Sequence, residues 1–239
     1  MRRFFKKKNY WKELSAKRAE CLTSPLTNEV SLNLSQPLLD KNTLFKALPF
    51  LVVDFETTGF EPAKNDIISI GWVEIVNMQI DLGSKQHFYI RNSQDINHET
   101  AVINQIVPQM IQNDGVPLEQ VINALLNASK GKILVVHGKV IEKNFLDFYA
   151  QKFLGIPELP LMWIDTMKIE EWKTAKTGGN TISQDNRLSA VRKRYNLPQY
   201  TAHNALIDSV GTAELLLAQI AHMYRDRHVT LETLYEMSQ

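Results

Sequence analysis

Residues 50–59, which read FLVVDFETTG, decide how the rest of the chain is interpreted. The first four form a continuous apolar run, which is typical of a strand buried on both faces of a sheet. Side chains two positions apart on a strand point to the same face, so Asp54 and Glu56 are expected to lie together. Two such carboxylates repel each other and are costly to remove from water. A hard divalent cation relieves that cost, although acidic residues are about as common where a strand simply emerges into solvent.

Strand and helix patterns surround this stretch. Four further strands are predicted, over residues 66–76, 80–90, 132–136 and 162–164. Three main helices are predicted, over residues 117–128, 139–153 and 204–222. Residues 171–186 are polar and contain glycine, which predicts a loop. Three successive strands followed by strand–helix alternation predict an α/β fold, with a mixed five-stranded sheet flanked by helices.

The composition is that of an ordinary globular protein, with 239 residues of which 44% are hydrophobic and 22% charged. The single cysteine, Cys21, excludes an internal disulfide and a thiolate metal cluster, and it favours a reducing compartment. The apolar runs are too short to cross a membrane, and the basic start lacks the apolar centre of a secretory signal. We therefore predict a cytoplasmic protein without a membrane partner.

Basic residues are concentrated at the start of the chain. Residues 1–18 hold eight of the 27 lysines and arginines but only one of the 26 acidic residues. Such an arm suits nucleic-acid phosphates, and a solvated basic helix explains it equally well. We predict a basic helical N-terminal extension and linker over residues 1–47, a main domain over 48–225 and a C-terminal tail over 226–239.

Two later segments add residues of related chemistry. His203 precedes a predicted helix and Asp208 lies in its first turn, so the pair can supply a proton acceptor and a third carboxylate. Taken alone, an aspartate favoured by the helix dipole beside an incidental histidine is the simpler explanation. His137 ends a predicted strand, and Glu142 lies one turn into the next helix, where an isolated glutamate is normally a surface residue.

In this order and spacing, the three segments resemble the three exonuclease motifs of the DEDDh family. That family includes the proofreading epsilon subunit of bacterial DNA polymerase III and ribonuclease T. Residues 50–59 resemble the first motif, 135–146 the second, and 200–217, YTAHNALIDSVGTAELLL, the third. Asn204 stands where the tyrosine branch of the family places its tyrosine, which favours the histidine branch.

The resemblance implies a ribonuclease H-like fold and a two-metal mechanism that releases nucleoside 5′-monophosphates. One Mg²⁺ or Mn²⁺ ion would lower the pKa of a water, His203 would deprotonate it, and a second ion would stabilise the leaving 3′ oxygen. The implied metal ligands, which are predicted to be catalytic together with His203, are Asp54, Glu56, Glu142 and Asp208. The residues implied to bind the substrate are Thr57, Thr58, Gly59 and His137.

Three positions depart from the family pattern. Glu142 stands where the second motif usually has aspartate, Gly138 replaces an asparagine, and an expected histidine near Asn104 is absent. We predict a nuclease that shortens DNA from its 3′ end, single-stranded or at a duplex terminus, in DNA repair or end trimming. A 3′–5′ exoribonuclease is the alternative, and an inactive nucleic-acid-binding module is the third hypothesis. Association with a polymerase or a sliding clamp, and formation of a homodimer, are left open by the sequence.

Overall fold

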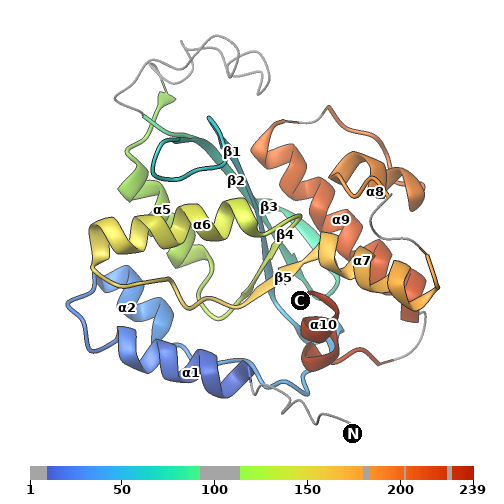
Figure 1. Cartoon of the computed structure of the whole chain (residues 1–239), viewed down its shortest axis with the longest axis horizontal. Coiled ribbons are helices and arrows are strands. Elements are labelled where there is room, and N and C mark those ends of the chain that lie inside the picture. Colours follow the sequence, from blue (N-terminus) through green and yellow to red (C-terminus); the bar gives the residue numbers. More distant parts are fainter. Residues whose placement is uncertain (1–9, 92–113, 180–183, 202, 225–227) are drawn as a thin grey trace, which may run out of the picture.

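A mixed sheet separates two groups of helices (Figure 1). The computed structural model describes residues 10–91, 114–179, 184–201, 203–224 and 228–239, so the predictions for the first nine residues and for Asn104 lie outside it. The five strands are β1 (Phe50–Thr57), β2 (Ile67–Val76), β3 (Gln79–Tyr89), β4 (Ile133–Val136) and β5 (Trp163–Asp165). They lie in the order β3-β2-β1-β4-β5. The first three strands pair antiparallel, and β4 and β5 continue the sheet in parallel with β1, which confirms the predicted mixed sheet.

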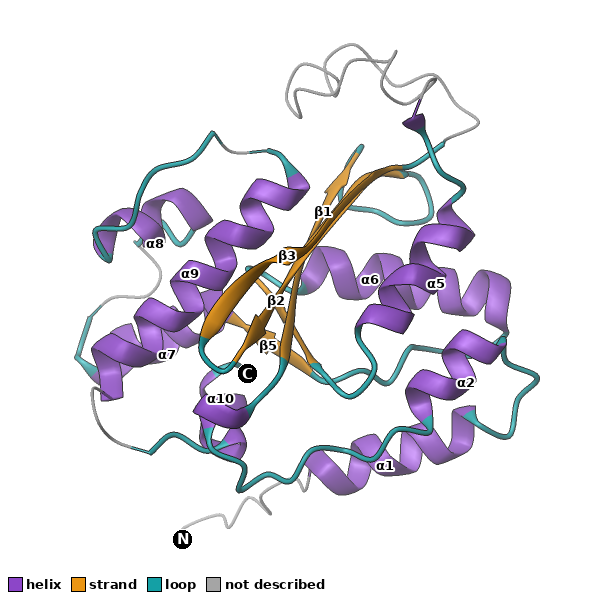
Figure 2. Cartoon of the chain, turned by 180° about the vertical axis from the view of Figure 1, so that it is seen from behind, coloured by secondary structure: helices purple, strands orange, loops and turns teal. Residues whose placement is uncertain are grey.

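Helices cover both faces of the sheet, as the views from opposite sides show (Figures 1 and 2). One face is covered by α2 (Asn28–Leu34), α5 (Leu118–Ala128), α6 (Val140–Tyr149) and the π-helical turn η2 (Ala150–Leu154). The other is covered by η1 (Phe45–Ala47), α7 (Thr166–Lys176), α9 (Ala205–Tyr224) and α10 (Leu231–Met237). Helix α8 (Leu188–Arg194) packs on α9, and α1 (Tyr10–Cys21) contributes to both layers.

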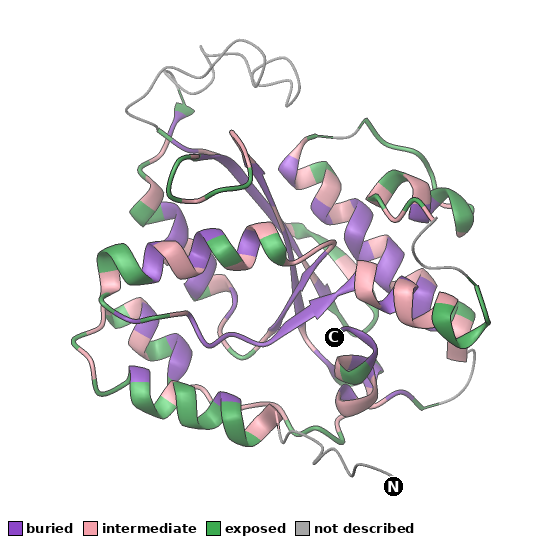
Figure 3. Cartoon of the chain, in the orientation of Figure 1, coloured by how far each residue is buried: buried purple, intermediate pink, exposed green. Residues whose placement is uncertain are grey.

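Strand β1 forms the centre of the core, because its side chains alternate between the two layers. Leu51, Val53 and Phe55 belong to the cluster shared with α5 and α6. Phe50 and Val52 belong to the cluster shared with α9. Figure 3 shows the central strands buried along most of their length. Full burial of each such side chain contributes about 1.5–3 kcal/mol, so this strand is a rigid support for the residues at its end.

Among the described residues, four helices lie where no helix is predicted, and α8 is one of them. The loop predicted from residue 171 is wrong as far as residue 176, because α7 occupies Thr166–Lys176 and the Asp165 carboxylate caps it by accepting from the Met167 N–H. Helix α2 lies inside the expected linker, with Val30 and Leu34 buried. Helix α10 lies inside the expected tail and buries three apolar side chains. In the described ranges, no helix combines the length and apolar character that a membrane span requires.

Candidate active site

Three carboxylates from two distant segments meet at the end of β1. Asp54 and Glu56 lie on the same face of β1, and Asp208 lies in the first turn of α9. One oxygen from each lies within 4.8 Å of the others. Asp54 and Asp208 are half-buried, and Glu56 is buried. The pairing of Asp54 with Glu56 follows directly from the two-residue repeat of a strand.

Helix α9 reaches the sheet because β2 has a glycine opposite Asp54. Gly71 pairs with Asp54 in the antiparallel register of β1 and β2. A Cβ atom at Gly71 would lie 2.3 Å from the backbone nitrogen of Leu206 and 2.4 Å from the carbonyl carbon of Ala205. The Ser209 hydroxyl donates to the Gly71 carbonyl at 2.8 Å and secures the contact. Glycine at this position therefore sets the distance between the β1 carboxylates and Asp208.

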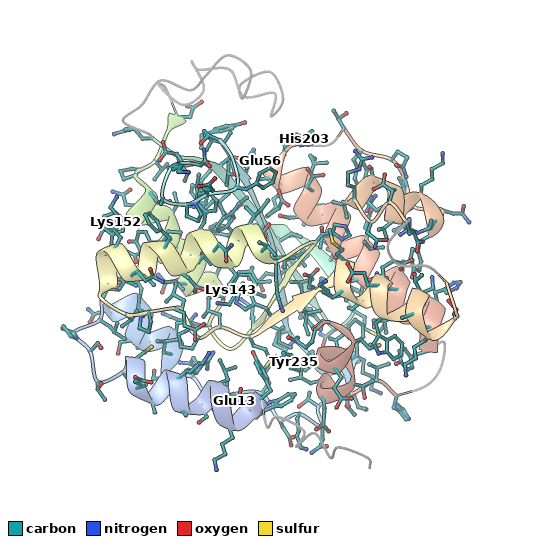
Figure 4. The ribbon with its side chains drawn as sticks, in the orientation of Figure 1. Glu13, Glu56, Lys143, Lys152, His203 and Tyr235 are labelled. Carbon is teal, nitrogen blue, oxygen red and sulfur yellow. The ribbon has the colours of Figure 1, made fainter. Side chains whose placement is uncertain are left out.

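The turn before α9 orients Asp208 and presents His203. The backbone N–H groups of His203 and Asn204 donate to Asp208 Oδ2 at 2.8 Å and 3.3 Å. His203 has a φ of 67°, a left-handed conformation that few non-glycine residues adopt. Its side chain is exposed at the same end of the molecule as Glu56 (Figure 4). The imidazole is thus free to meet a molecule bound at the carboxylates.

Glu142 lies nearby in α6 but outside the group of three carboxylates whose oxygens are within 4.8 Å, and its charge acts on Asp54. It lies in the first turn of α6 and is 4% exposed, and its Oε2 atom has no hydrogen-bond partner among the described residues. The backbone just before α6 is fixed by Asp165, which accepts from the N–H groups of Gly138 and Lys139 at 2.9 Å and 3.0 Å. The structure therefore gives the glutamate that stands in the aspartate position a buried, constrained place.

Burial and mutual repulsion raise the pKa values of these carboxyl groups. Desolvation, followed by the charges of Glu142, Glu56 and Asp208, holds the pKa of Asp54 well above its ordinary range. Desolvation is also the main cause of pKa values of about 8 for Glu56 and Glu142. Burial raises the pKa of Asp208, which hydrogen bonds from His203 and Asn204 partly oppose.

The donor set fits a hard divalent cation. Carboxylate oxygens are the ligands that Mg²⁺ and Mn²⁺ prefer. A cation also compensates the two unfavourable features of the site, the clustered negative charges and the unpartnered Glu142 oxygen. The acidic cluster is thus suited to a metal, as the sequence predicts.

A cavity of about 380 Å³ opens beside these residues, and Asp54, His203 and Asp208 are part of its lining. His137 also lines it, but both its ring nitrogens have protein partners: Nδ1 lies 2.8 Å from Thr166 Oγ1 and Nε2 lies 2.7 Å from the Asn186 carbonyl oxygen. A molecule in the cavity can therefore reach only the carbon edge or face of this ring unless those bonds break. Burial lowers the pKa of His137.

The other residues predicted to bind substrate lie at the end of β1 and in the turn that follows it. The Thr57 hydroxyl donates to the Gly59 carbonyl, and the Thr58 hydroxyl accepts from the Asp66 N–H. A Cβ atom at Gly59 would lie 2.6 Å from the Asn65 side chain, so this turn is tightly closed. Its backbone is consequently presented in one conformation next to Glu56.

Sequence reasoning missed three residues that support the site. Gly71 lies within a predicted strand, and Asp165 directly follows one. The third, Arg192, is buried and donates to the carbonyls of Gly211 and Pro198 and to the carboxylate of Glu214. It thereby joins α8 to α9 and to the segment leading to the histidine. The strand-to-helix position of Asp165, which is typical of a helix cap, was the one local signal available.

Residues 51–216 match the model of a family described as exonuclease, RNase_T. The chain belongs to this exonuclease family. This family supports the predicted DEDDh-type 3′–5′ exonuclease, with Glu142 in place of the usual aspartate. The chain is 30% identical over 186 residues to a PolC-type DNA polymerase III of Thermotoga petrophila, and the match covers 77% of this chain. It is 29% identical over 189 residues to the 3′–5′ exonuclease DinG of Staphylococcus aureus, which covers 79% of this chain. These alignments span only 13% and 20% of the relatives.

Solved structures share the fold of this exonuclease. Exonuclease X in complex with 5′-overhanging duplex DNA superposes with a TM-score of 0.58 at 20% identity, covering 80% of this chain and 99% of the other. The nuclease domain of 3′hExo, described as a DEDDh family member bound to rAMP, gives a TM-score of 0.60 at 18% identity, covering 76% and 96%. These similarities confirm the predicted ribonuclease H-like fold.

Proposed function

We propose that this exonuclease removes nucleoside 5′-monophosphates one at a time from the 3′ ends of DNA, with two Mg²⁺ or Mn²⁺ ions. The observation that carries the proposal is the convergence of Asp54, Glu56 and Asp208 within 4.8 Å, next to a buried and unpartnered oxygen of Glu142. An inactive binding module has no need for such a repulsive arrangement, because it opposes folding unless something is gained from it.

The carboxylates would hold the ions together. The charges of the other three carboxylates all act on Asp54, so Asp54 would hold the cations together with its neighbours. Glu142 lies in α6 outside the group of three, and its longer side chain would let it reach the same ions in place of the usual aspartate. Divalent ions held here would lower the pKa of a water and offset the charge that develops on the phosphate and the leaving oxygen.

The remaining chemistry belongs to the side chains that line the cavity. The exposed His203 imidazole accepts the proton of the attacking water, because it lies on the turn that orients Asp208 and lines the same cavity. The turn of Thr57, Thr58 and Gly59 contacts the terminal nucleotide. Since both His137 nitrogens have protein partners, this residue supports the cavity wall and meets the substrate only through its ring carbons.

DNA is favoured because the sequence relatives above are a DNA polymerase III and a DinG exonuclease. An exoribonuclease is the second candidate, because one structural neighbour is described with bound rAMP. That neighbour shares the fold at only 18% identity, so it has less weight than the relatives.

The test is digestion of 5′-labelled single-stranded DNA and RNA of the same sequence with Mg²⁺, Mn²⁺ or EDTA. We expect a ladder of shortened DNA that requires metal and disappears in Asp54→Asn. Glu61→Gln is the matched control, because Glu61 is an exposed carboxylate outside the cluster that pairs with Lys64. Faster shortening of RNA would support the exoribonuclease, and binding without cleavage under every metal would contradict the proposed activity.

A further inference from the structure

The cavity beside the carboxylates also reaches an aromatic residue that has no part in the chemistry proposed above. Asp54, His203 and Asp208 belong to its lining, and so does Tyr200. The turn of residues 57–59, which is proposed to contact the terminal nucleotide, does not belong to it. The volume, about 380 Å³, lies within the range of roughly 300–1,000 Å³ typical of small-molecule sites, so the cavity has room for a further part of the strand.

Tyr200 is held in one orientation by two contacts. Its hydroxyl donates to Glu214 Oε1 at 2.8 Å, and the guanidinium carbon of Arg192 lies 4.5 Å from the centre of its ring. Arg192 is fixed in turn by hydrogen bonds to two backbone carbonyls and to Glu214. A ring that is already oriented loses little further freedom when a ligand binds against it, which favours binding.

The outer face of the Tyr200 ring is accessible. Arg192 is 2% exposed and Tyr200 is 39% exposed, so the guanidinium covers the inner face of the ring and the exposed surface lies on the other side. Nucleobases stack on exposed aromatic rings whatever their identity, because every base has a π-face. The exposed ring in this cavity is therefore suited to a base.

The remaining walls favour a base over a phosphate. Three half-buried apolar side chains, from the first turns of α6, α7 and α8, line the cavity: Ile141, Met167 and Leu188. Arg187, the exposed arginine of the lining, already pairs with the carboxylate of Asp185. A flat, largely apolar ring gains contact with the three apolar side chains, whereas a phosphate would lose water and meet Arg187 only in competition with Asp185.

We propose that Tyr200 stacks on the base of the nucleotide second from the 3′ end. The inference rests on the proposed exonuclease function, which places the scissile phosphate at the carboxylates. That phosphate joins the terminal nucleotide to the second one. With the terminal nucleotide against residues 57–59, the second nucleotide lies on the side of the cavity, where Tyr200 and the apolar side chains receive its base. Because stacking needs no particular base, the contact serves strands of any sequence.

The test measures binding of 5′-labelled single-stranded DNA by fluorescence anisotropy in Mg²⁺, with Asp54→Asn present in every protein so that the strand is not shortened. Tyr200→Leu removes the ring, and Tyr200→Phe keeps the ring but removes the hydrogen bond to Glu214. Phe153→Leu is the matched control, because Phe153 is 59% exposed in η2 and does not line the cavity. We expect Tyr200→Leu to bind at least about fivefold more weakly than the control, and Tyr200→Phe to bind within about twofold of it.

An abasic site at the second nucleotide separates stacking from a merely structural role of Tyr200. Stacking requires the base, so this oligonucleotide should bind Tyr200→Leu and the control with the same affinity, while an abasic site at the fifth nucleotide should leave their difference intact. The proposal is overturned if Tyr200→Leu binds the complete strand as tightly as the control, or if the difference persists when the second base is missing. None of these measurements depends on cleavage, so a protein that binds in this way without shortening the strand would contradict the proposed function alone.

Discussion

Replacing Gly71 with alanine tests how the acidic site is assembled without touching an acidic residue. The new Cβ atom would lie 2.3 Å from the Leu206 nitrogen, and folded proteins essentially never show Cβ contacts below 3.0 Å. The first turn of α9 must therefore move away from β2 by at least about 0.7 Å. Both neighbouring atoms belong to the backbone, so no side-chain rotation can relieve the contact.

That displacement carries Asp208 away from Asp54, because the two residues lie on the elements that are forced apart. A misplacement of about 1 Å in an active site costs on the order of 100-fold in rate, whereas overpacking typically costs about 1–3 kcal/mol of stability. We expect Gly71→Ala to stay folded, with kcat for removal of the 3′-terminal nucleotide lowered about 100-fold.

The assay is metal-dependent digestion of a 5′-labelled oligonucleotide, with urea denaturation on the same preparation. Gly83→Ala is the control, because its Cβ atom would meet only the Asp81 side chain, at 3.0 Å, and no backbone atom. Ser209→Ala removes the hydrogen bond to Gly71 without adding an atom, and we expect a smaller loss of activity. Wild-type kcat in a folded Gly71→Ala protein would refute the reasoning that this contact sets the geometry of the site.

Three further outcomes are expected. The folded-state pKa of Glu142, about 8, lies above its unfolded value of ~4.3, so the metal-free protein should lose stability as pH rises from about 4 to 8. Thermal denaturation in EDTA measures this pH dependence of stability, and Glu142→Gln should make it less steep. An unchanged pH dependence in the variant would argue against a charged, desolvated Glu142. Asp165→Ala should lower the free energy of unfolding, measured in urea, by about 2–4 kcal/mol, because three backbone N–H groups lose their acceptor. A loss below about 0.5 kcal/mol would contradict the stabilising role of Asp165. His203→Asn, which tolerates the left-handed backbone, should lower kcat by about 10²–10⁴-fold with little change in melting temperature, and activity close to that of the wild type would exclude a proton-transfer role.

The sheet and the acidic groups were predictable because their signals are local. The apolar run at the start of β1 and the two-residue spacing of Asp54 and Glu56 need only a few neighbouring positions to be interpreted. The amphipathic pattern of α9 placed Asp208 in a first helical turn for the same reason. These segments could be joined into one predicted site only through their resemblance to a known set of motifs.

The supporting residues were not predictable because their roles depend on pairing between distant segments. Gly71 matters only once the register sets it opposite Asp54 and beneath α9. Asp165 matters because β5 lies beside β4, which brings its carboxylate to the backbone that leads into α6. Helix α7 was missed because its weak amphipathic pattern, with Ile169 its only buried apolar side chain, resembles a polar loop.

The central claim is that the four carboxylates hold divalent cations. Anomalous diffraction from a crystal soaked in Mn²⁺, at a concentration that supports cleavage, measures this directly. We predict anomalous peaks among Asp54, Glu56 and Asp208, with Glu142 within coordination distance of one of them, and no such peaks in Asp54→Asn. Mn²⁺ peaks found only elsewhere in an active protein would contradict the account.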